Sequence, residues 1–88
     1  MDLNGYKEQA KEFLIKINAL DESAAPKIRW LEQELRLLKD AVETNQQDKI
    51  RHQIYDMLYL LFEMAAEYDF DLVNEWDAGK EKKRVKYK

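Results

Sequence analysis

Apolar residues recur every three or four positions along most of this chain, which is the spacing of one face of an α-helix. The pattern is clearest over residues 26–44, where one continuous seam is formed by Ile28, Leu31, Leu35, Leu38 and Val42. One Pro and two Gly are the only strong helix breakers among 88 residues. The sequence therefore predicts an all-α protein, with no strand over residues 26–68.

Interruptions of this pattern divide the chain into four expected helices. They cover residues 4–20, 26–44 and 47–68, and a fourth follows "EYDFD" and passes Gly79 into the basic C-terminal residues. The expected start signals are Asn4, Pro26 in the first turn of the second helix, Asn45 or Asp48, and Asp69 or Asp71. Each helix has an apolar face and the loops are short, so we expect an antiparallel four-helix bundle.

The division into domains follows from length and charge. We expect one helical domain over residues 1–79 and a basic tail over residues 80–88. A chain this short buries only about 60–65% of its unfolded surface, so a lone monomer would be marginally stable. The predicted core consists of Phe13, Ile17, Leu31, Leu35, Leu38, Ile54, Leu58, Leu61 and Phe62.

Several large apolar residues are left over beyond one seam. They are Trp30, Leu37, Tyr55, Tyr59 and Trp76. Such residues are commonly buried against a second copy of the chain. We therefore expect dimerisation to complete the bundle, giving a homodimer or a dimer of dimers.

The net charge of −3 conceals an asymmetry. Residues 80–88 carry six Lys or Arg and one Glu, a charge of +5, whereas residues 1–79 carry nine Lys or Arg and seventeen Asp or Glu, a charge of −8. The tail could be a solvated helix end, a partner for the acidic body, or a surface that attracts phosphate. Nucleic-acid binding is disfavoured because the body has no basic stripe.

The location of the protein is constrained only loosely. The longest apolar stretch, residues 57–66, is interrupted by Glu63 and is far shorter than the roughly 20 residues of a membrane span. The start, "MDLNGYKEQAKEF", lacks the basic and apolar regions of a secretory signal. There is no cysteine for disulfides or thiolate metal sites. A cytoplasmic protein without a membrane segment is expected.

Glu34 is the unusual residue of the second expected helix. Its neighbours one turn away on both sides are apolar, namely Trp30, Leu31, Leu37 and Leu38. A carboxylate in such a sector must be paired, bind a cation or take up a proton. The alternative is that it lies at the edge of a wide apolar face and reaches water or a Lys or Arg.

Asp56 is the second acid of interest. It follows His52 by four residues, a spacing that permits a helix-face pair or two ligands of a metal ion. The alternative is that both residues lie on the solvated face of the third helix. The sequence contains neither a nucleophile constellation of the Ser/His/Asp or Cys/His type nor a Gly-rich phosphate loop.

Four stretches in order carry a resemblance to a known family. They are "EQELRLL" (32–38), "IRHQIYDMLYLL" (50–61), "DFDL" (69–72) and "KEKKRVKY" (80–87). They resemble the MazG-like all-α nucleotide pyrophosphohydrolases, a superfamily that includes dimeric dUTPases and phosphoribosyl-ATP pyrophosphatases. The resemblance covers about two thirds of the chain, from Trp30 to Tyr87, and is a pattern of spacing.

The resemblance implies a Mg²⁺ site and a nucleotide site. In that family the acids of E-x-x-E and E-x-x-D hold Mg²⁺, which grips the triphosphate while water attacks and pyrophosphate leaves. Glu34 and Asp56 match one acid of each pair, whereas Leu37 and Gln53 replace the others. Ala66 stands where the family often has Asn.

The resemblance also assigns the nucleotide contacts. Gln53 would contact the nucleotide, and Lys80, Lys83 and Arg84 are candidates for its phosphates. The expected function is thus a nucleoside triphosphate pyrophosphohydrolase-type protein that depends on Mg²⁺ if active. The alternative is a non-catalytic MazG-like helical dimer that acts as a binding or interaction module, because two of the four acids are missing.

Overall fold

The computed structural model describes residues 2–20 and 24–87. Four helices account for most of them: α1 (Leu3–Lys16), α2 (Ala24–Glu43), α3 (Gln47–Tyr68) and α4 (Leu72–Lys86). These described residues contain no strand, so the predicted all-α class is confirmed. None of the four helices is long and apolar enough to cross a membrane.

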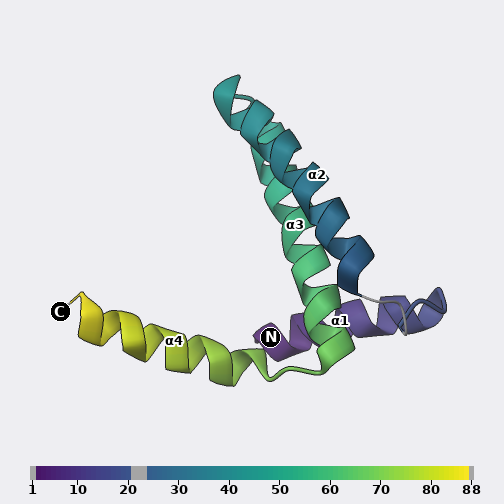
Figure 1. The fold of residues 1–88 in the computed structure, drawn as a ribbon, viewed down its shortest axis with the longest axis vertical. Helices are drawn as coiled ribbons and strands as arrows, with labels where there is room; N and C mark the ends of the chain where they lie inside the picture. Colours follow the sequence, from purple (N-terminus) through teal and green to yellow (C-terminus); the bar gives the residue numbers. More distant parts are fainter. Residues whose placement is uncertain (1, 21–23, 88) are drawn as a thin grey trace.

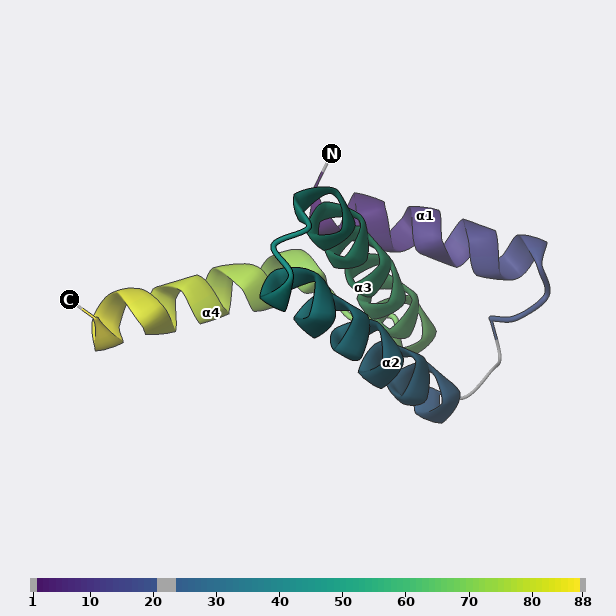
Figure 2. The ribbon, with the colours of Figure 1, turned by 90° about the horizontal axis from the view of Figure 1, so that it is seen from above.

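The helices form an open, angular arrangement. α2 and α3 pack as an antiparallel hairpin, and α1 crosses α3 near the end farthest from the α2–α3 turn (Figures 1 and 2). α4 packs against α1 and leads away from the hairpin (Figure 1). The hairpin is thus the antiparallel part of the expected bundle, while α4 is directed away from it.

Three helices end in the same way. Asn18, Asn45 and Asp69 each adopt a positive φ, of 58°, 53° and 56°, one or two residues after the ends of α1, α2 and α3. The next residue then donates its N–H to a carbonyl five positions earlier, as in Ala19 to Leu14 at 2.8 Å. This is the Schellman motif, which short polar side chains tolerate better than branched ones. Asn45 and Asp69 therefore end helices, and their expected role as N-caps is wrong.

The helix starts correct a further expectation. Asp2, and not Asn4, caps α1, since its carboxylate accepts from the N–H of Gly5 at 2.9 Å. Asn4 instead reaches α4, donating to the Asp71 carboxylate at 3.0 Å and accepting from the N–H of Leu72 at 2.8 Å. Asp71 is the N-cap of α4, one of the two residues expected there. α3 begins after Gln46 without a side-chain cap, so Asp48 lies in its first turn.

The start of α4 should be sensitive to acid. Hydrogen bonds from the Asn4 amide and the Asn74 N–H lower the pKa of Asp71 below its ordinary value of 3.8. The contribution of this carboxylate to stability is therefore fully present above that value and lost as the pH falls through the lowered pKa. We expect the difference in melting temperature between the natural chain and Asp71→Ala to shrink below about pH 4.

Asp77→Ala is the control for this comparison, because Asp77 lies on α4 but does not cap it. A difference between the natural chain and Asp71→Ala that stays constant down to about pH 2 would contradict the role of the carboxylate charge.

The buried interior of one chain is small. Its apolar members are Ala10, Leu14, Ala19, Ala41, Ala65 and Ala66. Of the predicted core, Leu31, Leu38 and Phe62 are half-buried, whereas Phe13, Ile17, Leu35, Ile54, Leu58 and Leu61 are exposed. The expected burial of these six residues is wrong for the single chain. A two-helix hairpin crossed by one further helix cannot cover the whole apolar seam.

Two lysines lie inside this small interior. The side chain of Lys27 is 1% exposed, and its Nζ lies 2.5 Å from Oε1 of Glu67. Lys7 donates to the carbonyl of Phe70 at 2.7 Å and lies 3.5 Å from Asp69. Lys27 thus connects α2 to Glu67 in the last turn of α3, and Lys7 connects α1 to the segment that follows α3.

Candidate functional site

A hollow of about 540 Å³ lies between α2 and α3, bordered by one residue of α1. We call it the acidic hollow. Its lining residues are Phe13, Trp30, Glu34, Tyr55, Asp56, Tyr59, Leu60 and Glu63. The two predicted metal ligands, Glu34 and Asp56, therefore line the same space from different helices, and Glu63 is a third acid beside them.

Glu34 has the polar partner that its apolar neighbours require. The Nε2 group of Gln53 donates a hydrogen bond to Oε2 of Glu34 across the α2–α3 interface. Gln53 itself is buried, with 8% of its surface exposed. The sequence predicted a partner for Glu34 but suggested a Lys, an Arg or a metal cation, whereas the structure provides a neutral amide.

Asp56 has a partner on its own helix. The Nε2 atom of His52 lies 3.2 Å from the Asp56 carboxylate, at the predicted spacing of four residues. The contact is an ion pair only when His52 is protonated. About a third of the Asp56 side chain is exposed, so its carboxylate remains open to the hollow and to water.

Aromatic rings form the other walls of the acidic hollow. Phe13 meets Tyr59 edge to face, with ring centroids 6.0 Å apart, and Tyr55 lies 6.0 Å from Tyr59. Partial burial raises the pKa of Tyr59, and the nearby charge of Glu63 adds to this effect. Tyr59 therefore stays a neutral hydrogen-bond donor at physiological pH, beside rings with flat apolar faces.

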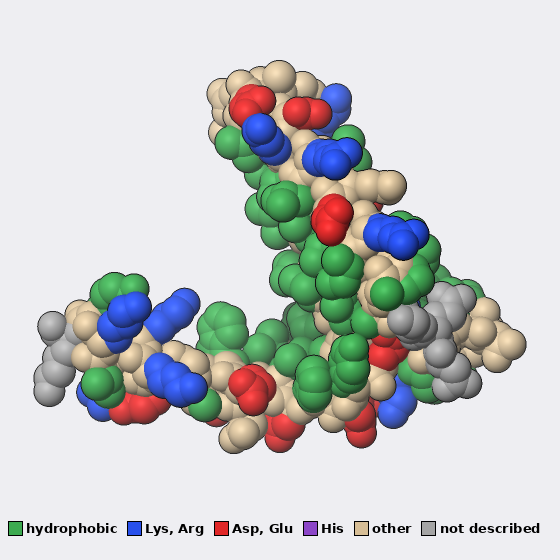
Figure 3. All heavy atoms as spheres, viewed as in Figure 1, with side chains coloured by type: hydrophobic (Ala, Val, Ile, Leu, Met, Phe, Trp, Pro, Cys, Tyr) green, Lys and Arg blue, Asp and Glu red, His purple; other side chains and the backbone are tan. Residues whose placement is uncertain are grey.

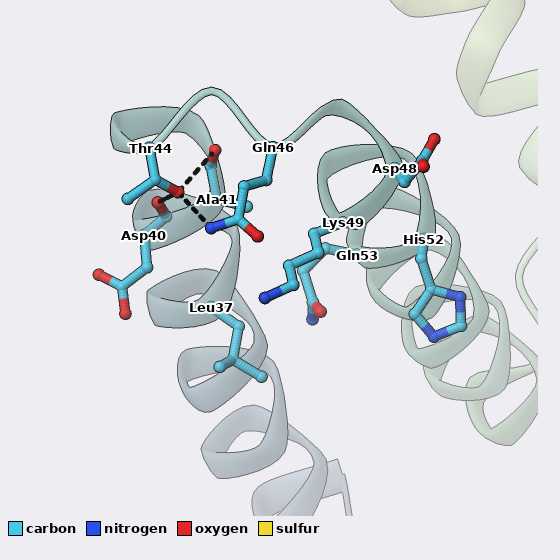
Figure 4. A pocket seen from close by; sticks show the side chains of 9 residues that line it. All are labelled: Leu37, Asp40, Ala41, Thr44, Gln46, Asp48, Lys49, His52 and Gln53. Atoms are coloured by element: carbon cyan, nitrogen blue, oxygen red, sulfur yellow. Dashed lines mark hydrogen bonds between the residues drawn. The ribbon is translucent and has the colours of Figure 1, made fainter.

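A second hollow, of about 550 Å³, lies at the tip of the hairpin. Its lining comes from the end of α2 (Leu37, Asp40 and Ala41), from Thr44 and Gln46 of the turn, and from the start of α3 (Asp48, Lys49, His52 and Gln53) (Figure 4). The side chains of Lys49 and Gln53 point from α3 toward α2 in this view. Gln53 lines this tip hollow and donates to Glu34, which lines the acidic one, whereas Leu37, at the position where the resemblance would place an acid, lines the tip hollow alone.

The predicted phosphate contacts lie elsewhere. Lys80 and Lys83 follow Trp76 by four and seven residues on α4, and all three line a separate hollow of about 260 Å³. Glu81 binds Arg84 through two contacts, at 3.0 and 2.6 Å, which raises the pKa of Arg84 and lowers that of Glu81. Because α4 packs against α1 and leads away from the hairpin, one chain does not bring these cations to the acidic hollow.

The donors of the described residues do not form a closed metal cage. Within residues 2–20 and 24–87, no group of three or more His, Cys, Asp or Glu side chains is arranged to hold a metal ion. A Mg²⁺ ion at Glu34 and Asp56 would therefore need water or phosphate oxygens to complete its coordination.

Sequence reasoning missed the buried Lys27–Glu67 pair. The spacing places Lys27 on one face of α2 with Glu34 and Ala41, at intervals of seven residues, but it gives no indication of the partner Glu67.

Searches of protein-family models, curated proteins and solved structures find no match to this chain.

Proposed function

We propose that this chain is a MazG-like, pyrophosphohydrolase-type protein that binds a nucleoside triphosphate with Mg²⁺ in the acidic hollow. The observation that carries the proposal is that Glu34 of α2 and Asp56 of α3 line one hollow together with aromatic rings. Carboxylates suit Mg²⁺, and flat aromatic faces suit a nucleobase. The volume of about 540 Å³ lies in the range of small-molecule sites.

The donor set fits one Mg²⁺ ion held jointly with phosphate. Gln53 occupies Oε2 of Glu34, which leaves Oε1 for a cation, and the Asp56 carboxylate is partly exposed. When bound, Mg²⁺ would neutralise charge on the triphosphate oxygens. In this proposal, Glu34 and Asp56 hold the ion, and the aromatic rings of the hollow contact the nucleobase.

Hydrolysis is expected to be slow or absent. Leu37 has no group that could bind a cation, and Gln53 can donate to Glu34 but cannot accept a proton at neutral pH. Neither side chain can therefore activate a water molecule. Lys80, Lys83 and Arg84 enter this proposal only as phosphate contacts supplied by a second copy, given their position on α4.

A non-catalytic helical homodimer, or a dimer of dimers, is the second candidate. It is favoured by the many large apolar side chains that one chain leaves exposed, including Leu35, Ile54, Leu58 and Leu61. In this interpretation the protein is a cytoplasmic binding or interaction module, and the acidic hollow carries no nucleotide.

The two candidates differ in their response to cations. We expect millimolar Mg²⁺ or Mn²⁺ to raise the melting temperature of the natural chain. At a hundredfold excess of the cation over its dissociation constant, the free energy of unfolding should rise by about 2.7 kcal/mol. Asp56→Asn should abolish the shift, because it removes one of the two carboxylate ligands. Asp77→Asn, on the distant helix α4, is the matched control and should keep it.

Pyrophosphate release from a panel of nucleoside triphosphates, with each cation, tests for turnover. If the cation shifts neither the natural chain nor Asp56→Asn, then Glu34 and Asp56 are not a metal pair and the non-catalytic candidate is favoured. Rapid pyrophosphate release would instead contradict the role given to Leu37 and Gln53.

A further inference from the structure

Six exposed aliphatic residues occupy one side of the α2–α3 hairpin. We call them the aliphatic face: Ile28, Leu35, Val42, Ile54, Leu58 and Leu61, each 43–56% exposed. The three on α2 follow one another at intervals of seven residues, and the three on α3 at intervals of four and three. These spacings place each set along one line of its helix.

The aliphatic face lies opposite the acidic hollow. An α-helix turns about 100° per residue, so Leu58 and Leu61 lie about half a turn from Asp56 and Glu63. Figure 3 shows hydrophobic side chains along the side of the hairpin that faces the open angle toward α4. The aliphatic face is therefore separate from the candidate nucleotide site.

The amount of exposed surface indicates a missing partner. The chain exposes 7113 Å², whereas a compact monomer of this mass exposes about 5,500 Å². Its radius of gyration is 15.0 Å, against about 12 Å for a compact domain of the same length. The excess, roughly 1,600 Å², exceeds the 800 Å² or so that each partner buries in a standard interface.

We propose that the aliphatic face is the dimer interface and that its occupant is the aliphatic face of a second copy. This inference rests on the homodimer proposed above, names its surface and does not depend on nucleotide binding. Two such faces are chemically alike and uncharged, which suits a two-fold interface in which the same patch meets itself. Two hairpins then form one four-helix core.

The residues of α4 fit this surface less well than a second hairpin does. Trp76, Lys80, Lys83 and Tyr87 share one side of α4, so that helix presents cations and a phenol where an aliphatic partner is required. Asn4 also holds the start of α4 against α1, on a course away from the hairpin. The open angle between α4 and the hairpin leaves room for a second copy.

Leu35 and Leu37 provide a matched test, since both are leucines of α2 with 54% exposure but lie on different sides of the helix. Leu35→Lys should raise the dimer dissociation constant about a hundredfold or more, because it places an unpaired charge in the interface. Leu37→Lys should leave it within a few-fold of the natural value. Sedimentation equilibrium measures both, and circular dichroism reports whether each variant is folded.

Thiol reactivity gives a second measurement that avoids a buried charge. The chain has no cysteine, so Leu35→Cys and Leu37→Cys each carry a single thiol. At concentrations where the dimer forms, the thiol at position 35 should react with Ellman's reagent at least tenfold more slowly than that at position 37, and dilution should remove the difference. Equal reactivity at both positions overturns the proposal.

The outcomes separate this inference from the proposals on which it draws. A natural chain that stays monomeric at tens of micromolar overturns the dimer and the interface together. A dimer that resists Leu35→Lys but dissociates with Leu37→Lys keeps the dimer and moves its interface to the other side of α2, which overturns the inference. Cation binding at Asp56 is measured separately and bears on neither result.

Discussion

Replacing Lys27 by Met should lower the free energy of unfolding by about 3–5 kcal/mol. The Lys27 and Glu67 side chains are 1% and 7% exposed, with 2.5 Å between Nζ and Oε1. Oε2 of Glu67 is also buried, and it accepts no hydrogen bond from the described residues. Without the ammonium group, the Glu67 carboxylate would be a buried charge without an opposite charge beside it. Such a charge strongly destabilises the folded state. Urea denaturation at a fixed protein concentration measures the loss.

Two comparisons make this prediction specific. Lys39→Met removes an exposed ion pair, in which Nζ of Lys39 lies 3.9 Å from Oε1 of Glu43. This change should lower the free energy of unfolding by less than about 1 kcal/mol. The double variant Lys27→Met with Glu67→Met should recover most of the loss, because a well-packed apolar pair often replaces a buried ion pair without cost. A Lys27→Met variant no less stable than Lys39→Met would show that the buried pair contributes little.

Leu14→Ala should cost about 2–5 kcal/mol, as expected for a fully buried leucine. Leu14 is 1% exposed and is the largest buried apolar side chain among the described residues. The loss comes from the apolar surface removed and from the cavity left among the surrounding helices. Thermal and urea unfolding of the variant measure it, and a loss below about 1 kcal/mol would contradict the assigned burial.

Leu58→Ala is the informative companion to Leu14→Ala. Leu58 is 48% exposed in one chain, so its truncation should cost less than that of Leu14 when the protein is dilute and monomeric. The cost should approach that of Leu14 at concentrations where the aliphatic face is covered. If the loss of stability caused by Leu58→Ala does not depend on protein concentration, Leu58 lies outside the dimer interface.

Helix periodicity predicted the elements well because it depends on local spacing alone. The expected third helix, residues 47–68, has the same bounds as α3. The first was expected to continue to residue 20 but ends at Lys16, since Asn18 takes a positive φ that stops the helix. Asn and Asp tolerate this conformation, but they also cap helix starts, so their role at a break is ambiguous from sequence.

The buried residues were harder to predict than the helices. Periodicity shows which residues share a face but not what covers that face, and the seam around Leu35 and Leu58 is left open in one chain. Lys27 could not be assigned to the interior from its own helix, because a charged residue is rarely buried without a partner. Its partner, Glu67, lies 40 residues away, a distance that no local pattern spans.

The candidate site was predicted in part. The apolar neighbours of Glu34 correctly indicated a polar partner, and the structure places Glu34 and Asp56 in one hollow. The separation of Lys80 from that hollow could not be foreseen, because it depends on the direction in which α4 leaves α3. Contacts with α1 hold that direction, through Asn4 at the start of α4 and Lys7 at the carbonyl of Phe70 just before it.

The Asn4 contact also bears on the order in which the molecule folds. It joins residues 67 and 68 positions apart, whereas Gln53 and Glu34 are 19 apart. Closing the longer loop costs about 1 kcal/mol more in chain entropy. The α2–α3 hairpin can therefore form before Asn4 meets the start of α4. The helix with the largest number of basic residues, five of the fifteen in the chain, is then the last to be fixed and the first to be released. Brief openings of the native protein should thus detach α4 while the hairpin stays intact.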